Sequence, residues 1–441
     1  MRHYGVHPRR AKGRAKTTRF PASRHRQVEY VTDNVDAPMP RAANAGDDTK
    51  GQKSKNMSQR QLPIILALGT TQTLAWASSY YLPALLADPM AHDLGISTNW
   101  IFGAFSASLV ISAMLGPHIG RQIDLVGGRQ VLSASNLIIA AGLVLLGISQ
   151  SATVMAVGWL VLGLGMAMGL YDAAFAALGR IYGAEARGSI TGITLMAGFA
   201  STVGWPLTAW GLAHIGWRDT CFAWAAANIL IGLPLNFFML PAIKGAKQAA
   251  ATAEKPHIPL DRTMILLAFV FAAVWTVTGA MAVHFPRILE ATGASHVEAI
   301  SAGALIGPAQ VIARILEASV LSRFHPLWST RLACVTHPIG AAIVAIFGAP
   351  AATAFALLHG SGNGILTIAR GTLPLAIFGP KDFGYRLGII GAPVRMAQAL
   401  APLAFGLLID MMGAKVLMVS SALSLSALAA LLLIRAKRRP D

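Results

Sequence analysis

Five charged residues lie inside long apolar stretches of this chain: Asp172, Arg314, Glu317, Arg370 and Arg395. Placing a charged side chain at the centre of a lipid bilayer costs about 2.5 to 3.5 kcal/mol on insertion scales. If the stretches cross a membrane, each of these charges requires an interior partner, an aqueous cavity or a function. Three arginines against two acids give the stretches a net positive charge, which favours the binding of anions.

Arg395 is the first choice for a substrate anchor. It lies about nine residues into the apolar stretch 386–409, and at about 1.5 Å per residue this places it near the middle of a membrane-crossing helix. Its guanidinium can donate two parallel hydrogen bonds to a carboxylate or a similar oxyanion. Gln398 lies one turn further along the same helix face. Arg370 lies nearer one end of its stretch, where it either joins this site or extends its charge toward the membrane surface.

Two acids are the candidate proton-coupling groups, and each also has a structural interpretation. Arg314 and Glu317 are three residues apart and share a helix face, so a structural ion pair between them competes with a free Arg314 that binds substrate. Asp172 could carry a proton, because burial raises the pKa of a carboxyl group. We favour the alternative that Asp172 is a buried partner for Arg370 or another cation.

Aromatic and hydroxyl residues of the first apolar stretch could line a cavity and donate hydrogen bonds to a polar solute, and Tyr80 is chosen from this group. Aromatic residues near a membrane surface are equally typical of an interfacial belt. Asn363 lies between glycines in a run that predicts close helix packing. The predicted substrate-binding residues are Arg395, Gln398, Arg370, Arg314, Tyr80 and Asn363.

The composition is that of a membrane protein, with 54% hydrophobic and 12% charged residues in a chain of 441. Cys221 and Cys334 are the only cysteines, so neither a disulfide framework nor a cysteine metal site is expected. The sequence contains no phosphate-binding Gly-Lys-Ser/Thr loop and no helix with metal-ligand His/Glu spacing. These observations predict no enzyme activity, cofactor or metal, and they disfavour transport driven by ATP.

Twelve apolar segments follow residue 60, each near the roughly 20 residues that a helix needs to cross a hydrocarbon core. They cover residues 63–87, 99–119, 130–149, 152–178, 189–213, 219–241, 263–287, 297–320, 332–348, 351–377, 386–409 and 415–434. Alternate loops and the C-terminus hold sixteen Lys and Arg residues, whereas the opposite loops hold three: Arg218, Arg287 and Lys415. The positive-inside rule then places both termini in the cytoplasm of a multi-pass protein of the cell inner (plasma) membrane. Because the excess of Lys and Arg lies on the cytoplasmic side of the membrane, the net charge of +17 does not indicate a nucleic-acid partner.

The chain divides at a polar stretch after the sixth segment. We expect a disordered basic tail over 1–57, six-helix bundles over 60–241 and 263–435, a cytoplasmic central loop over 242–262, and a basic tail over 436–441. Ile181, Gly183 and Pro206 recur at a constant offset of 196 residues as Ile377, Gly379 and Pro402, as an internal duplication predicts. Met57 is an alternative start of the chain.

Residues 120–129 join the second and third segments as a charged, glycine-containing loop. The loop resembles a signature of the major facilitator superfamily of transporters, Gly-x-x-x-Asp-[Arg/Lys]-x-Gly-[Arg/Lys]-[Arg/Lys]. The matching residues are Gly120, Asp124, Gly127 and Arg129. Leu125 and Gly128 depart from it. The resemblance implies an all-α integral membrane fold of twelve transmembrane helices in two pseudo-symmetric six-helix bundles. The four matching residues are predicted to gate transport. Asp124 either pairs with Arg129 or caps the N-terminus of a neighbouring helix.

The fourth and fifth segments and the arginines of the second half resemble the monocarboxylate and oxalate/formate porters. An Arg-x-x-Gln-Gly pattern, carried by many proton-coupled members, is not found, which puts proton coupling in doubt. We expect a secondary transporter, acting by alternating access as a monomer, of a small organic anion (a mono- or dicarboxylate), with a co-transported or exchanged ion left open. The alternatives are efflux of a neutral or cationic toxic compound, such as a drug or metalloid, and a non-transporting membrane sensor.

Overall fold

The computed structural model describes residues 61–242 and 258–434. These residues belong to one compact unit. The expected basic tail 1–57 with its alternative start at Met57, most of the central loop 242–262 and the tail 436–441 lie outside the described residues.

Most of the described residues are helical, and no β-strand occurs in the two ranges. Seven helical stretches in them are long and apolar enough to cross a membrane. The stretch Ala152–Met239 has 88 residues and Phe383–Leu432 has 50, so at about 20 residues per crossing they hold several crossings each. Each of the twelve predicted segments is mostly helical. The structure therefore confirms an all-α, multi-pass membrane fold.

The first half begins with a helix over residues 61–75. It continues through η1 (Trp76–Tyr80), α2 (Pro83–Leu94), α3 (Thr98–Val126), α4 (Gly128–Gly147), α5 (Ala152–Gly169), α6 (Tyr171–Tyr182), η2 (Gly183–Glu185), α7 (Ala186–Ala197), α8 (Ala200–Ala227), η3 (Asn228–Gly232) and α9 (Leu233–Met239).

The second half begins after the central loop. It consists of α11 (Arg262–Glu290), α12 (His296–Ala304), α13 (Ile306–Ser319), η4 (Leu321–Arg323), α14 (Pro326–Phe347), η5 (Ala349–Ala351), α15 (Ala352–Phe378), α16 (Phe383–Met412), η6 (Gly413–Lys415) and α17 (Val416–Leu432).

Glycine marks the reversal inside α8. Gly216 has φ 80° and ψ 169°, a backbone conformation outside the helical region that residues with a Cβ rarely adopt. The break falls between the predicted segments 189–213 and 219–241. One glycine therefore lets the chain end one crossing and begin the next without a separate loop.

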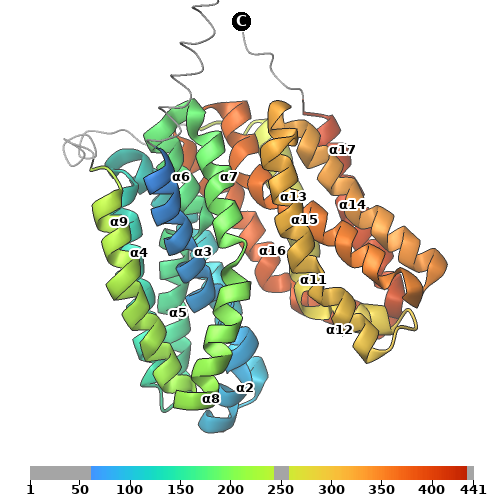
Figure 1. Ribbon diagram of the computed structural model, residues 1–441, viewed down its shortest axis with the longest axis horizontal. Helices are drawn as coiled ribbons and strands as arrows, with labels where there is room; N and C mark the ends of the chain where they lie inside the picture. The colour runs from blue at the N-terminus through green and yellow to red at the C-terminus, as the bar shows by residue number, and fades with distance from the viewer. Residues whose placement is uncertain (1–60, 243–257, 435–441) are drawn as a thin grey trace, which may run out of the picture. The chain divides into compact units, whose positions relative to one another are not determined.

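The buried apolar side chains form four clusters that follow the two halves of the chain. Two clusters contain second-half residues only, and the other two contain mostly first-half residues. In Figure 1, α4, α5, α6 and α8 lie on the left, whereas α13, α14, α15 and α17 lie on the right. Each half therefore buries most of its apolar surface within itself, as two packed helix bundles do.

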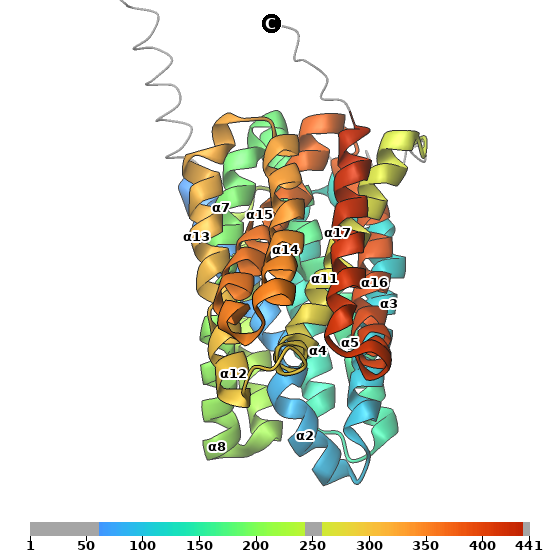
Figure 2. The same ribbon diagram turned by 90° about the vertical axis from the view of Figure 1, so that its right-hand side faces the viewer.

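The closest approach between the halves is made by α3 and α16, which lie side by side (Figures 1 and 2). A Cβ on Gly120 would collide with the backbone of Gly384, and a Cβ on Gly388 would collide with the backbone of Gly116. Four glycines thus allow two helix backbones to touch, as small residues do at other membrane helix contacts.

Candidate transport site

Asp172 lies between two arginines of the second half. Its Oδ1 accepts a hydrogen bond from Arg370 Nε at 2.8 Å, and its Oδ2 accepts one from Arg370 Nη2 at 2.7 Å. Arg395 Nη2 also donates to Oδ2, at 3.3 Å. All three side chains are largely buried. Asp172 belongs to α6, Arg370 to α15 and Arg395 to α16, so a carboxylate of one half joins the two arginines of the other.

Two further predicted site residues, Gln398 and Tyr80, lie beside this cluster. Gln398 Nε2, one turn from Arg395, donates to the hydroxyl of Tyr80 at 3.3 Å. The Arg370 guanidinium lies over the ring of Trp275, 5.1 Å from its centroid. The sequence showed no signal for Trp275, because a lone tryptophan in an apolar segment is ordinary.

Tyr80 is part of an aromatic cluster. The Trp76 ring centroid lies 5.0 Å from that of Tyr80, 5.8 Å from that of Tyr81 and 5.0 Å from that of Tyr171. The cluster combines residues of the first and fourth predicted segments. It supplies an apolar surface beside the charged groups, with tyrosine hydroxyls among it.

Arg314 is a buried arginine whose partners, in the described part of the chain, are all uncharged. Its Nη1 donates to the carbonyl of Thr194 at 3.2 Å, and its Nη2 donates to Gln310 Oε1 at 3.3 Å and Thr367 Oγ1 at 3.4 Å. Its Nε is buried without a hydrogen-bond partner. Arg314 therefore carries a buried positive charge and an unused donor.

The predicted pair of Arg314 with Glu317 is wrong. Glu317 Oε1 instead accepts from Nη2 of Arg187, at the start of α7, at 3.2 Å, and Arg187 Nη1 donates to the carbonyl of Phe324 at 2.9 Å. A spacing of three residues places two side chains on one helix face, but a partner on a neighbouring helix can be nearer. In the sequence Arg187 is one of many loop charges, and nothing about its position predicts a contact with Glu317.

Asn363 lines a small cavity of about 20 Å³. The other polar side chains that line this cavity are Thr278, Thr336, His337, His359 and Ser424, and Cys334 also lines it. Thr278 Oγ1 donates to Asn363 Oδ1 at 3.3 Å. Asn363, a predicted substrate-binding residue, therefore lines a pocket of the second half and does not belong to the Asp172 cluster. The two histidines were not singled out from the sequence, although both lie inside apolar segments.

Asp124, in the predicted gating loop, caps the N-terminus of α16. Its Oδ1 accepts from the Gly384 amide and its Oδ2 from the Tyr385 amide, each at 2.8 Å. An anion at a helix N-terminus is stabilised by free amides and by the helix dipole. Of the two predicted roles, the helix cap is the one formed. Arg129 instead lies 4.1 Å from the Phe237 ring centroid.

The ion pairs at the other end of the helices stay within one half. Arg218 pairs with Asp93, and Arg287 pairs with Asp410. The hydrogen bond from Trp217, followed by that from Arg218, lowers the pKa of the Asp93 carboxyl. By contrast, the contacts of Asp124 with α16 and of Arg187 with Glu317 join the two halves, and both lie at the end opposite to these ion pairs.

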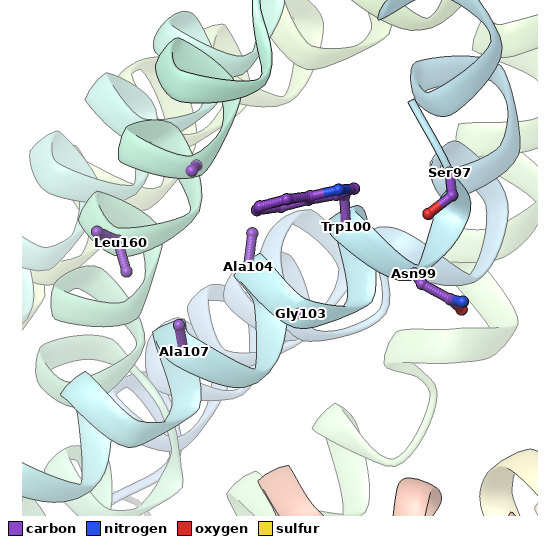
Figure 3. Close-up of a pocket in the computed structure, with 8 residues that line it drawn as sticks. Ser97, Asn99, Trp100, Gly103, Ala104, Ala107 and Leu160 are labelled. Carbon is purple, nitrogen blue, oxygen red and sulfur yellow. The ribbon is translucent and has the colours of Figure 1, made fainter. Parts of the chain in front are cut away.

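A larger hollow of about 420 Å³ lies beside α3 and α5, but none of the predicted site residues lines it. Figure 3 shows the ring of Trp100 between the two helices, whereas Asn99 points away from Leu160. Its surface is mainly apolar, with Gly103, Ala104 and Ala107 on α3. It therefore offers few groups that would orient a polar solute.

Apolar helices long enough to cross a membrane, with buried charges shared between two helix bundles, define a multi-pass membrane transporter. The family model described as Major Facilitator Superfamily matches residues 68–358, which is more than half of the chain. The chain belongs to this superfamily, whose members are secondary transporters of solutes. The match confirms the resemblance in residues 120–129.

Two known proteins show what the chain is similar to. It is 33% identical over 165 residues to mouse solute carrier family 2, facilitated glucose transporter member 10; the match covers 35% of this chain and 28% of that protein. The chain thus spans under a third of that relative's length in the match. The human organic anion transporter MFSD10 (TETRAN) shares the fold, with a TM-score of 0.65 and 16% identity over 84% of this chain and 99% of that structure.

Proposed function

We propose that the protein transports a small organic anion, a mono- or dicarboxylate. The observation that carries this proposal is the excess of buried positive charge: Asp172 is shared by Arg370 and Arg395, and Arg314 is bonded only to uncharged groups. A buried charge without a counter-charge is expensive. An anionic substrate would supply the missing negative charge.

Arg314 is the better anchor for the carboxylate, ahead of Arg395. Arg395 Nη2 already bonds to Asp172, so substrate would have to compete with a carboxylate of the protein. The charge of Arg314 has no such competitor among the described residues, and its Nε is an unused donor. The aromatic cluster of Trp76, Tyr80, Tyr81 and Tyr171 suits an apolar body attached to the carboxylate.

The similarities are consistent with this substrate class. The solved structure of similar fold is titled an organic anion transporter. The mouse relative is named a glucose transporter, but a neutral sugar would leave the charge of Arg314 uncompensated. On the loop charges described above, we propose an inner (plasma) membrane location with cytoplasmic termini. A monomer is a separate part of the proposal.

The transport cycle we propose is a rocking of residues 60–241 against 263–435, with the described structure facing outward. Asp124 and Arg187 contact the second half at the end where the predicted cytoplasmic loops lie. Closure at that end leaves the opposite end to admit solute. Alternating access then requires these contacts to break as the other end closes.

The test is flux into liposomes that contain the purified protein, with lactate, succinate, oxalate and glucose as probes. We expect wild-type protein to carry at least one carboxylate. Arg314→Gln should reduce carboxylate flux by about 10- to 100-fold, since a hydrogen bond to a charged group is worth about 1.5 to 3 kcal/mol.

Arg262→Gln is the matched control, because Arg262 is exposed at the start of α11. It should transport as wild type does. Flux of glucose or of a cationic drug without any carboxylate flux would replace the anion proposal by the efflux alternative, and no flux of any solute would favour a membrane sensor.

A further inference from the structure

Two buried histidines contact each other inside the second half. Nδ1 of His337, on α14, lies 3.1 Å from Nδ1 of His359, on α15, and both side chains are about 95% buried. Two nitrogen lone pairs repel at this distance, so one of the two nitrogens carries a hydrogen. Neither residue contributes to the cluster around Asp172.

The hydrogen bonds around the pair determine where its protons lie. The Ser420 hydroxyl donates to the carbonyl of Leu417 at 3.1 Å, so it accepts from Nε2 of His337 at 2.9 Å. His337 therefore has its proton on Nε2 and a lone pair on Nδ1. His359 must then donate from its own Nδ1, and its Nε2 is the unprotonated nitrogen. No hydrogen-bond partner of that Nε2 occurs among the described residues.

Two aromatic rings and a small cavity border His359. The ring centroids of Phe285, on α11, and Phe355 lie 6.4 Å and 6.2 Å from that of His359, near the range at which aromatic rings attract cations. The adjoining cavity of about 20 Å³ is large enough for one water molecule.

The residues that line the cavity beside the pair come from α11, α14, α15 and α17. Thr278 of α11, Cys334 of α14 and Ser424 of α17 line the cavity, and Cys334 is the titratable group among them. No Asp, Glu, Lys or Arg of the described ranges lines it. A proton bound here would therefore be an additional charge and would not be cancelled locally.

A polar face of α15 connects the pair with the transport site. His359, Asn363, Thr367 and Arg370 follow one another at intervals of four, four and three residues, so they lie on one face of the helix. Thr367 donates to the Asn363 carbonyl at 2.8 Å and accepts from Arg314 at 3.4 Å. At about 1.5 Å per residue, His359 lies about 16 Å along the helix from Arg370.

The two acids predicted for proton coupling are less suited to it. Asp172 bonds to two arginines and Glu317 bonds to Arg187. A proton on either acid would neutralise it and so remove the charge attraction of its ion pair, although Oε2 of Glu317 is itself buried without a hydrogen-bond partner. The histidine pair can take one without losing a bond, because Nε2 of His359 is unused.

We propose that the His337–His359 pair is the proton-binding site of this transporter and that one proton moves with the anion. The inference rests on the proposed function. Nε2 of His359 forms an N–H bond with a proton delivered by hydronium, which leaves as water, and the ring becomes an imidazolium. The reverse transfer to water on the other side restores the neutral pair, and no other bond changes.

The test combines flux with a direct titration of the pair. Liposomes with a pH dye inside receive an inward gradient of succinate or lactate, and anion uptake and internal acidification are recorded together. Wild-type protein should show both. His359→Asn keeps an amide donor near the position of Nδ1 but removes Nε2, so it should carry anion by exchange while its anion-driven acidification falls to the level of protein-free liposomes.

His337→Gln is the second variant, because it keeps a donor to Ser420 and loses the acceptor for His359; it too should lose acidification. His214→Gln, at an exposed histidine of α8, is the matched control and should behave as wild type. The ¹⁵N shifts of labelled histidine in wild type should show the pair taking up a proton as the pH falls.

Acidification by His359→Asn at the wild-type rate would overturn the inference, as would ¹⁵N shifts of the pair that do not change with pH. Wild-type protein that moves succinate or lactate without protons overturns the inference alone. Wild-type protein that moves neither anion overturns the proposed function as well.

Discussion

Asp172 holds two arginines with one carboxylate, and this ratio governs how the site responds to substitution. Removing one partner of a buried ion pair costs about 3 to 5 kcal/mol, because the remaining charge stays in a medium of low dielectric. Loss of Asp172 leaves two charges without a partner. Loss of Arg395 leaves Asp172 still paired with Arg370 through two hydrogen bonds.

We therefore expect Asp172→Asn to lower the melting temperature of the purified protein more than Arg395→Gln does. Asp172→Asn should cost about 3 kcal/mol or more. The double variant, with both changes, should be more stable than Asp172→Asn alone, because one of the two uncompensated charges is gone. A double variant that loses the sum of the two single effects would show that the three side chains are not energetically coupled.

At the scale of helices, the contact of α3 with α16 depends on four glycines, Gly116, Gly120, Gly384 and Gly388, because they have no Cβ to separate the two backbones. A Cβ on Gly384 would lie 2.8 Å from Oδ1 of Asp124 and 3.0 Å from the Cβ of Ala176, and it would collide with the Gly120 carbonyl. These neighbours belong to backbone or to short side chains, so they cannot rotate away. Any added atom must push the helices apart.

Gly384→Ala is accordingly expected to destabilise the protein by about 1 to 3 kcal/mol, as overpacking in tightly packed interiors does. Gly188→Ala is the control, because a Cβ there meets no atom within 4 Å and alanine favours helix. Thermal unfolding in detergent, followed by the loss of helical circular dichroism, compares the two. Equal stability of Gly384→Ala and Gly188→Ala would mean that the contact is looser in solution.

At the scale of the whole transporter, two separate contacts join the halves at the same end, which is the closed end in the proposed cycle. Asp124 caps α16, and Arg187 joins α7 to Glu317 of α13. Both must break for the halves to rock apart there. A helix cap and an ion pair each contribute little against the energy of a packed interface, so their removal should shift the balance between conformations without unfolding the protein.

Labels on Glu185→Cys and Lys381→Cys can measure this shift, because both positions are exposed at this end. The native Cys221 and Cys334 are buried and should label slowly. With spin labels at these two cysteines, double electron–electron resonance should show a longer label-to-label distance when Asp124→Asn and Arg187→Gln are added. Carboxylate flux should be reduced in the same variants. Unchanged distances with normal flux would leave these residues without a gating role.

The sequence determined those properties that depend on composition and periodicity. Apolar segments of membrane-crossing length predicted the all-α fold, and the match in residues 120–129 predicted the superfamily. Because a charge inside an apolar segment is costly wherever it lies, Asp172, Arg370 and Arg395 could be singled out before any neighbour was known.

Only the tertiary structure decided which charges meet. Arg314 and Glu317 share a helix face, yet Arg314 bonds to α7 and α15 while Glu317 bonds to Arg187. The His337–His359 contact joins two helices whose histidines each looked ordinary alone. Spacing along one helix fixes neighbours on that helix, but a buried charge takes the partner that is nearest in space, and helix packing brings that partner from another part of the chain.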